Sequence, residues 1–99
     1  MEKFEEIIKS EKPVLIDFFA TWCGPCKMMH PILEEVHSLA GDKARIIKID
    51  IDKNQSLASL YNVRSVPTLM IFKKGEQLWR ASGVHSAADL EAELSKYYD

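Results

Sequence analysis

The stretch PVLIDFFATWCGPCKMMHP, residues 13–31, predicts a strand followed directly by a helix. Apart from Asp17, residues 13–19 are apolar at odd and at even positions, which point to opposite faces of a strand. They therefore predict a β-strand that is covered on both faces. Residues 23–39 carry apolar side chains at helical spacing, with Pro25 in the first turn and Pro31 as a predicted kink. The segment WCGPC, residues 22–26, is thereby placed at a strand-to-helix junction.

The rest of the chain continues this alternation of helices and strands. Helical spacing predicts helices over residues 2–10, 55–61 and 86–94, the last beginning with a capping box. Residues 44–51, 66–72 and 77–82 read as strands, and the Lys74-Gly75 turn joins the last two into an antiparallel hairpin. The order predicts an α/β fold in which four helices flank a mixed four-stranded sheet, with a parallel pair formed by its first two strands.

Composition limits the classes of protein that the chain can represent. Its 99 residues fit a single domain over residues 1–99. The net charge of −2, with 13 basic and 15 acidic side chains, argues against a nucleic-acid-binding surface. Apolar runs fall short of the ~20 residues of a membrane span. The charged start MEKFEEIIKSEK lacks the pattern of a secretory signal, so we expect a cytoplasmic protein unless an export signal was removed earlier.

The two cysteines, Cys23 and Cys26, carry the most informative chemistry. The first N–H groups of a helix lack intrahelical partners, and the helix dipole adds partial positive charge there. Both effects favour the thiolate form of Cys23. A thiolate attacks disulfides at neutral pH, whereas a protonated thiol does not. Cys26 lies one turn further and can displace a partner bound to Cys23. We therefore expect an exposed, ionised Cys23 and a shielded Cys26.

Three other interpretations of this pair remain open. A structural disulfide would close a loop of only four residues, which stabilises a fold by about 2 kcal/mol in the chain-entropy model. A zinc site could combine Cys23, Cys26 and His30, although no further C-x-x-C or H-x₃-H pattern completes the ligand set. The two residues could also be ordinary buried cysteines.

Asp17 interrupts the apolar strand five residues before Trp22. Burial of an isolated carboxylate is costly, so the pKa of Asp17 should rise. Such a group could exchange a proton with Cys26, and Lys48 on the predicted neighbouring strand could modulate it. The alternative for Asp17 is a carboxylate that reaches water at the end of the strand, and the alternative for Lys48 is an ordinary surface lysine.

Pro67 precedes a predicted strand. A trans peptide bond before this proline is the default.

Taken together, these segments resemble the thioredoxin family. The resemblance rests on DFFATWCGPCKM at residues 17–28 with Pro31, KIDID at 48–52, VPT at 66–68, KGE at 74–76, and Gly83. It covers nearly the whole chain, in order and at the spacing of the family. WCGPC is a highly specific motif, whereas a C-x-x-C pair alone would not be.

The resemblance implies a role for each matching residue. Cys23 would attack a target disulfide and Cys26 would resolve the mixed disulfide. Asp17 would manage the proton of Cys26 with Lys48 beside it, and the peptide bond before Pro67 would be cis. A flat apolar rim that receives a substrate segment would be formed by Trp22, Gly24, Pro25, Val66, Pro67, Gly83 and Val84.

The implied activity is that of a protein disulfide reductase. An NADPH-dependent thioredoxin reductase would supply the electrons, and targets would include ribonucleotide reductase, peroxiredoxins and methionine sulfoxide reductases. No phosphate-binding glycine loop or flavin site is visible, so we expect no bound organic cofactor. We also expect no bound metal and a monomeric protein. Two alternatives remain: a disulfide oxidase or isomerase, which the uncharged Gly24-Pro25 disfavours, and a non-catalytic module that binds proteins through the rim.

Two departures from the family pattern affect the prediction. The family often has tryptophan where this chain has Phe19, which removes an indole N–H. The family also usually begins with an extra edge strand, but only three residues precede Phe4 here. We therefore predict that residues 45–51 form an edge of the sheet, which could pair with another chain.

Overall fold

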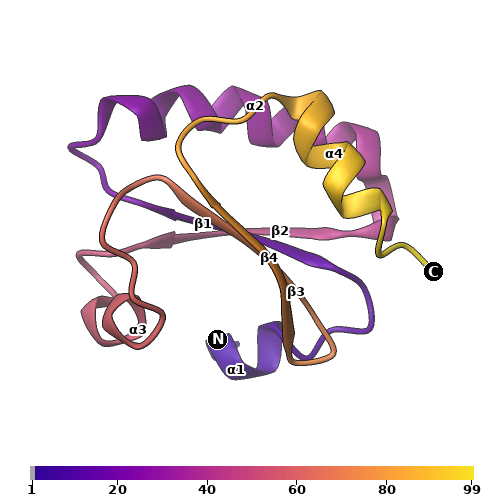
Figure 1. The fold of residues 1–99 in the computed structure, drawn as a ribbon, viewed down its shortest axis with the longest axis horizontal. Helices are drawn as coiled ribbons and strands as arrows, with labels where there is room; N and C mark the ends of the chain where they lie inside the picture. Colours follow the sequence, from indigo (N-terminus) through magenta and orange to yellow (C-terminus); the bar gives the residue numbers. More distant parts are fainter. Residues whose placement is uncertain (1) are drawn as a thin grey trace.

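A computed structural model describes residues 2–99 of the chain. In this range four strands form one mixed sheet in the order β2-β1-β3-β4 (Figure 1). Strand β1, Val14–Phe19, pairs in parallel with β2, Arg45–Asp50, and antiparallel with β3, Thr68–Lys73. Strand β4, Glu76–Ser82, pairs antiparallel with β3. The predicted four-stranded sheet, with the second strand at one edge, is therefore confirmed.

Helices cover both faces of this sheet, as the sequence predicts. Helices α2, Gly24–Ala40, and α4, Ala87–Ser95, lie on one face (Figure 1). Helices α1, Phe4–Ile7, and α3, Gln55–Leu60, lie on the other face. A short 3₁₀ helix, Gly41–Lys43, follows α2. This arrangement is the α/β architecture that the sequence predicts, with a helical layer on each face of the sheet (Figure 1).

The first helix is shorter than the predicted range of residues 2–10. It ends at Ile7, and the following segment binds the turn between β3 and β4. The N–H group of Gly75 donates to the carbonyl of Ile8 at 2.8 Å, and that of Lys74 donates to Ser10 at 2.9 Å. These long-range bonds direct the chain toward β1, so the helix does not continue.

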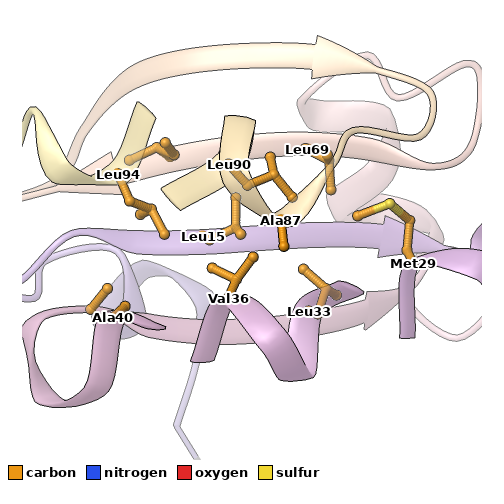
Figure 2. Packing of buried hydrophobic residues seen from close by; sticks show 11 residues of the cluster. Leu15, Met29, Leu33, Val36, Ala40, Leu69, Ala87, Leu90 and Leu94 are labelled. Carbon is orange, nitrogen blue, oxygen red and sulfur yellow. The ribbon is translucent and has the colours of Figure 1, made fainter. Parts of the chain in front are cut away.

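Two apolar clusters hold the layers together. The first joins the sheet to α2 and α4 (Figure 2), and its fully buried members include Leu15, Met29, Val36, Leu69, Leu90 and Leu94. The second lies on the opposite face and includes Ile16, Phe18 and Met70. Adjacent residues of β1 thus enter different clusters, because side chains alternate across a strand. The prediction that β1 is covered on both faces is confirmed.

Local signals in the sequence fix several element boundaries. The Ser86 hydroxyl accepts a hydrogen bond from the N–H of Asp89 at 3.1 Å, which caps α4 as predicted. Lys74 and Gly75 have φ values of 54° and 85°, as a two-residue hairpin turn requires. The third strand begins at Thr68 instead of the predicted residue 66, because Pro67 has no N–H to contribute to the ladder.

Between residues 2 and 99, the chain contains no helix with the length and apolar character needed to cross a bilayer.

Candidate active site

The two cysteines lie where β1 leads into α2. Cys23 is the N-cap residue of α2, and Cys26 is in the first turn, which Pro25 helps to initiate. The two residues form a disulfide with their Cα atoms 5.2 Å apart. The N–H of Cys26 donates to Cys23 Sγ at 3.1 Å. The predicted position of the pair at the start of a helix is confirmed, and so is its ability to close a disulfide.

The expected exposure of Cys23 is wrong for this oxidised state. Cys23 is only 5% exposed and Cys26 is 1% exposed. The disulfide joins Cys23 Sγ to Cys26, and the carbonyl oxygen of Val66 lies 3.6 Å from Cys23 Sγ. A difference in access remains, because Cys23 contributes to the wall of a surface hollow and Cys26 does not.

This hollow has a volume of about 540 Å³ and lies beside the disulfide. It contains four of the predicted rim residues, namely Trp22, Gly24, Pro25 and Val66. Four further residues of its wall were not predicted from the sequence, namely Ile51, Val63, Arg64 and Ser65. A signal was present, since three of them directly precede Val66-Pro67 in the sequence.

The remaining predicted rim residues lie next to the hollow but do not line it. Pro67 is buried, and the peptide bond between Val66 and Pro67 is cis, as the resemblance implies. The carbonyl of Pro67 accepts a hydrogen bond from the N–H of Gly83 at 2.9 Å. Gly83 has a φ of 87°, and Val84 after it is 40% exposed. These residues therefore extend the surface from the cis bond toward the end of β4.

Trp22, the aromatic residue of WCGPC, is 69% exposed. Its indole N–H donates to Asp52 Oδ2 at 2.9 Å. The N–H of Asp52 in turn donates to Asp50 Oδ1 at 2.9 Å. Asp52, which the sequence reasoning placed only in a matching motif, thus orients the indole ring over the hollow.

Asp17 is fully buried in β1. Neither of its carboxylate oxygens has a hydrogen-bond partner within residues 2–99. Burial raises the pKa of Asp17 from 3.8 to about 6, against a smaller opposing effect of the Lys48 charge. The predicted rise is therefore confirmed, and its main cause is desolvation.

The neighbours of Asp17 on β1 show where its side chain points. Leu15 and Phe19 share its face of the strand, because residues two apart point the same way. Leu15 belongs to the cluster that contains Met29 of α2, and Phe19 packs against the cluster of Ala20 and the two cysteines. The carboxyl group thus faces the first turns of α2, the helix that begins with the disulfide.

Lys48 lies beside Asp17, since the two are register partners in the parallel pair of β1 and β2. Its side chain is exposed, and its ammonium group contacts Nδ1 of His30 on α2. The sequence indicated His30 only as a possible zinc ligand. Over residues 2–99, no group of three or more His, Cys, Asp or Glu side chains is placed to hold a metal ion.

The fold and the cysteine pair at the start of α2 define a thiol–disulfide oxidoreductase. The sequence matches the model of the Thioredoxin family over residues 1–96, so the chain belongs to the thioredoxin family. A thioredoxin-like protein of Synechocystis sp. is 47% identical over 93 residues, which cover 94% of this chain and 89% of the relative. The protein is thus a dithiol–disulfide reductase with Cys23 and Cys26 as its redox-active pair.

Solved structures agree with this membership. A mutant thioredoxin from Halobacterium salinarum superposes with a TM-score of 0.85 at 41% identity, covering 96% of this chain and 82% of the other. A second chain comes from work on the thiol resolving mechanism in yeast mitochondrial 1-Cys peroxiredoxin via glutathione/thioredoxin systems. It superposes with a TM-score of 0.85 at 32% identity and covers 94% of this chain and 86% of the other.

Proposed function

We propose that the two cysteines act in a fixed order. The thiolate of Cys23 attacks one sulfur of a target disulfide, which forms a mixed disulfide and releases the other sulfur as a thiolate. The thiolate of Cys26 then attacks Cys23 Sγ, which releases the target dithiol and leaves the Cys23–Cys26 disulfide. Two electrons pass to the target in this exchange. The observation that supports the order is that Cys23 lines the hollow, whereas Cys26 does not.

The start of α2 favours the thiolate form of Cys23 once the disulfide is reduced. The N–H of Cys26 already points at Cys23 Sγ, at 3.1 Å. The positive end of the helix dipole acts on the same atom. A hydrogen bond and a dipole that both favour the anion lower the pKa of a thiol, so Cys23 attacks at neutral pH.

Asp17 is the proposed proton acceptor for Cys26, which must lose its proton before it can attack. The pKa of Asp17 is raised to about 6, so the carboxyl group can accept and return a proton near neutral pH. Its position beneath the first turns of α2 suits this task. Lys48, its register partner on β2, keeps positive charge on the same side and favours the ionised carboxylate.

The hollow and its border are the proposed binding surface for the target segment. Apolar contacts would come from Trp22, Gly24, Pro25 and Val66, with Pro67, Gly83 and Val84 extending the surface. The carbonyl of Val66, 3.6 Å from Cys23 Sγ, lies where a bound segment would cross the reacting sulfur. Recognition through backbone and apolar contacts would accept many target sequences.

Partners follow from the direction of electron flow. We propose that an NADPH-dependent thioredoxin reductase recharges the pair, and that peroxiredoxin, ribonucleotide reductase and methionine sulfoxide reductase are targets. The structural neighbour from work on a yeast 1-Cys peroxiredoxin supports peroxiredoxin as a target.

A reductase needs a compartment where thiols stay reduced, so we propose that the protein acts in the cytoplasm. We also propose that residues 1–99 act as one monomeric domain, without a bound organic cofactor or metal.

Insulin reduction with dithiothreitol tests the order of the two cysteines. Cys23→Ser should abolish activity, whereas Cys26→Ser should accumulate mixed disulfides with its targets. Leu39→Ser is the matched control, because Leu39 is 57% exposed at the far end of the same helix and should leave the rate unchanged. Equal rates for wild type and Cys23→Ser, or no trapped disulfide with Cys26→Ser, would refute the scheme. A disulfide oxidase would instead show faster oxidation of reduced substrates than insulin reduction.

A further inference from the structure

His30 joins the helix of the active site to the strand that carries Lys48. It lies four residues after Cys26 in α2, and its half-buried ring packs edge-on against Phe19, with centroids 6.0 Å apart. This contact fixes the ring so that Nδ1 meets the ammonium group of Lys48. An ammonium group can only donate, so Nδ1 is the acceptor in this contact.

Lys48 has other polar neighbours that its side chain could contact in place of His30. Its long side chain borders a second hollow, whose wall also contains Glu34, His37 and Ser38 of α2. Glu34 is one turn beyond His30 and offers a competing negative charge. Asp50, on the same face of β2, already accepts a hydrogen bond from the N–H of Asp52. Of these polar neighbours and His30, only His30 has a hydrogen bond to Lys48 within residues 2–99.

We propose that His30 is a positioning residue, which holds the Lys48 ammonium group beside Asp17 and so sets the charge that this carboxyl group experiences. The proposal rests on the role given above to Asp17 in the resolving step. The ring of His30 packs against Phe19 and contacts the ammonium group of Lys48. Lys48 is the register partner of Asp17, and its charge acts on the buried carboxyl group through space.

Removal of the His30 acceptor should change the position of the positive charge near Asp17, while Asp17 itself is not substituted. The ammonium group would then turn toward Glu34 or water, away from the buried carboxyl. The pKa of Asp17 is held down by the Lys48 charge, so it should rise when that charge moves away. An opposite charge at close range shifts a pKa by about 1–3 units, so a partial displacement should give roughly 0.5–1 unit.

The test is a carbon-detected NMR titration of the Asp17 carboxyl group in the oxidised protein. His30→Phe keeps the ring that packs on Phe19 but removes the acceptor, and it should raise the pKa of Asp17 by roughly 0.5–1 unit. His30→Asn restores an acceptor oxygen near the position of Nδ1 and should recover most of the shift. His37→Ala removes the other histidine near Lys48 and should leave the titration unchanged. An unchanged or lowered pKa in His30→Phe would overturn the proposal.

A double-mutant cycle separates positioning from a change in packing. If His30 acts through Lys48, then His30→Phe should cause no further shift in a Lys48→Met background. An equal shift in both backgrounds would overturn the proposal. This titration needs no turnover, so it is independent of the proposed catalytic order. A failure of mixed-disulfide trapping would refute that order while leaving the charge measurement to decide the role of His30.

Discussion

Replacement of Asp17 by asparagine should make the folded protein more stable at neutral pH, although it removes a group that we propose takes part in catalysis. Asp17 is fully buried, and its oxygens have no hydrogen-bond partner within residues 2–99. Its ionised form is therefore poorly accommodated in the folded state. Asparagine has nearly the same shape and cannot ionise.

The magnitude follows from the pKa of this carboxyl group. A rise from 3.8 to about 6 in the folded state corresponds to about 3 kcal/mol. The folded state binds the proton more tightly than the unfolded state, so the free energy of unfolding falls as pH rises. This loss is nearly absent below pH 3.8, develops up to about pH 6, and is complete above that value. The asparagine variant lacks this loss at every pH.

Urea denaturation of the oxidised proteins at pH 4 and pH 7.5 measures the effect. At pH 4 the two proteins should agree within about 0.5 kcal/mol, because the folded wild type holds a neutral carboxylic acid. At pH 7.5 Asp17→Asn should be more stable by about 3 kcal/mol, which raises Tm by at least about 10 °C in a domain of this size.

A matched control uses Asp42→Asn, since Asp42 is an exposed carboxylate in the short 3₁₀ helix. It should change stability by less than about 0.5 kcal/mol at either pH. The reasoning fails if Asp17→Asn gives the same stability difference at pH 4 and pH 7.5, because a purely steric effect would not depend on ionisation.

Three further substitutions test the fold by the same denaturation assay. Leu33→Ala in the α2–α4 cluster should destabilise the protein by about 2–5 kcal/mol, and a smaller loss would mean that the cluster collapses around the cavity. Ser86→Ala removes the hydroxyl that caps α4 and should cost about 1 kcal/mol; no change would show that the cap contributes nothing. Gly75→Ala places a side chain at φ 85° and should cost about 1–2 kcal/mol, whereas a stabilised variant would contradict the turn geometry.

Local patterns in the sequence were sufficient for most of the fold. The apolar run of β1, interrupted only by Asp17, predicted coverage on both faces, because buried strands carry apolar side chains on both sides. Lys74-Gly75 predicted the hairpin, and Ser86 with Asp89 predicted the start of α4. Each of these signals concerns neighbouring residues, and its physical cause lies within a few positions of the chain. The buried acid in β1 was predictable for the same reason.

Features that depend on long-range contacts were not predictable in this way. Helix α1 ends early because its following segment binds the β3–β4 turn, which is more than 60 residues away. The contact of His30 with Lys48 depends on how α2 lies across β2. Cys23 is less exposed than expected because Val66, 43 residues later, covers its sulfur in the oxidised state. None of these partners can be deduced from the spacing of residues near them.

The position of the active site follows from the directions of the strands. Because β1 and β2 are parallel, their carboxyl ends meet at one end of the sheet, where the N–H of Ile51 donates to the carbonyl of Phe19 at 2.9 Å. Strand β3 runs antiparallel to β1, so its beginning, preceded by Val66, arrives at the same end. Cys23 follows β1 there. The disulfide thus lies at this end of the sheet, at the start of α2 and beside Val66, where the hollow gives a target access to Cys23.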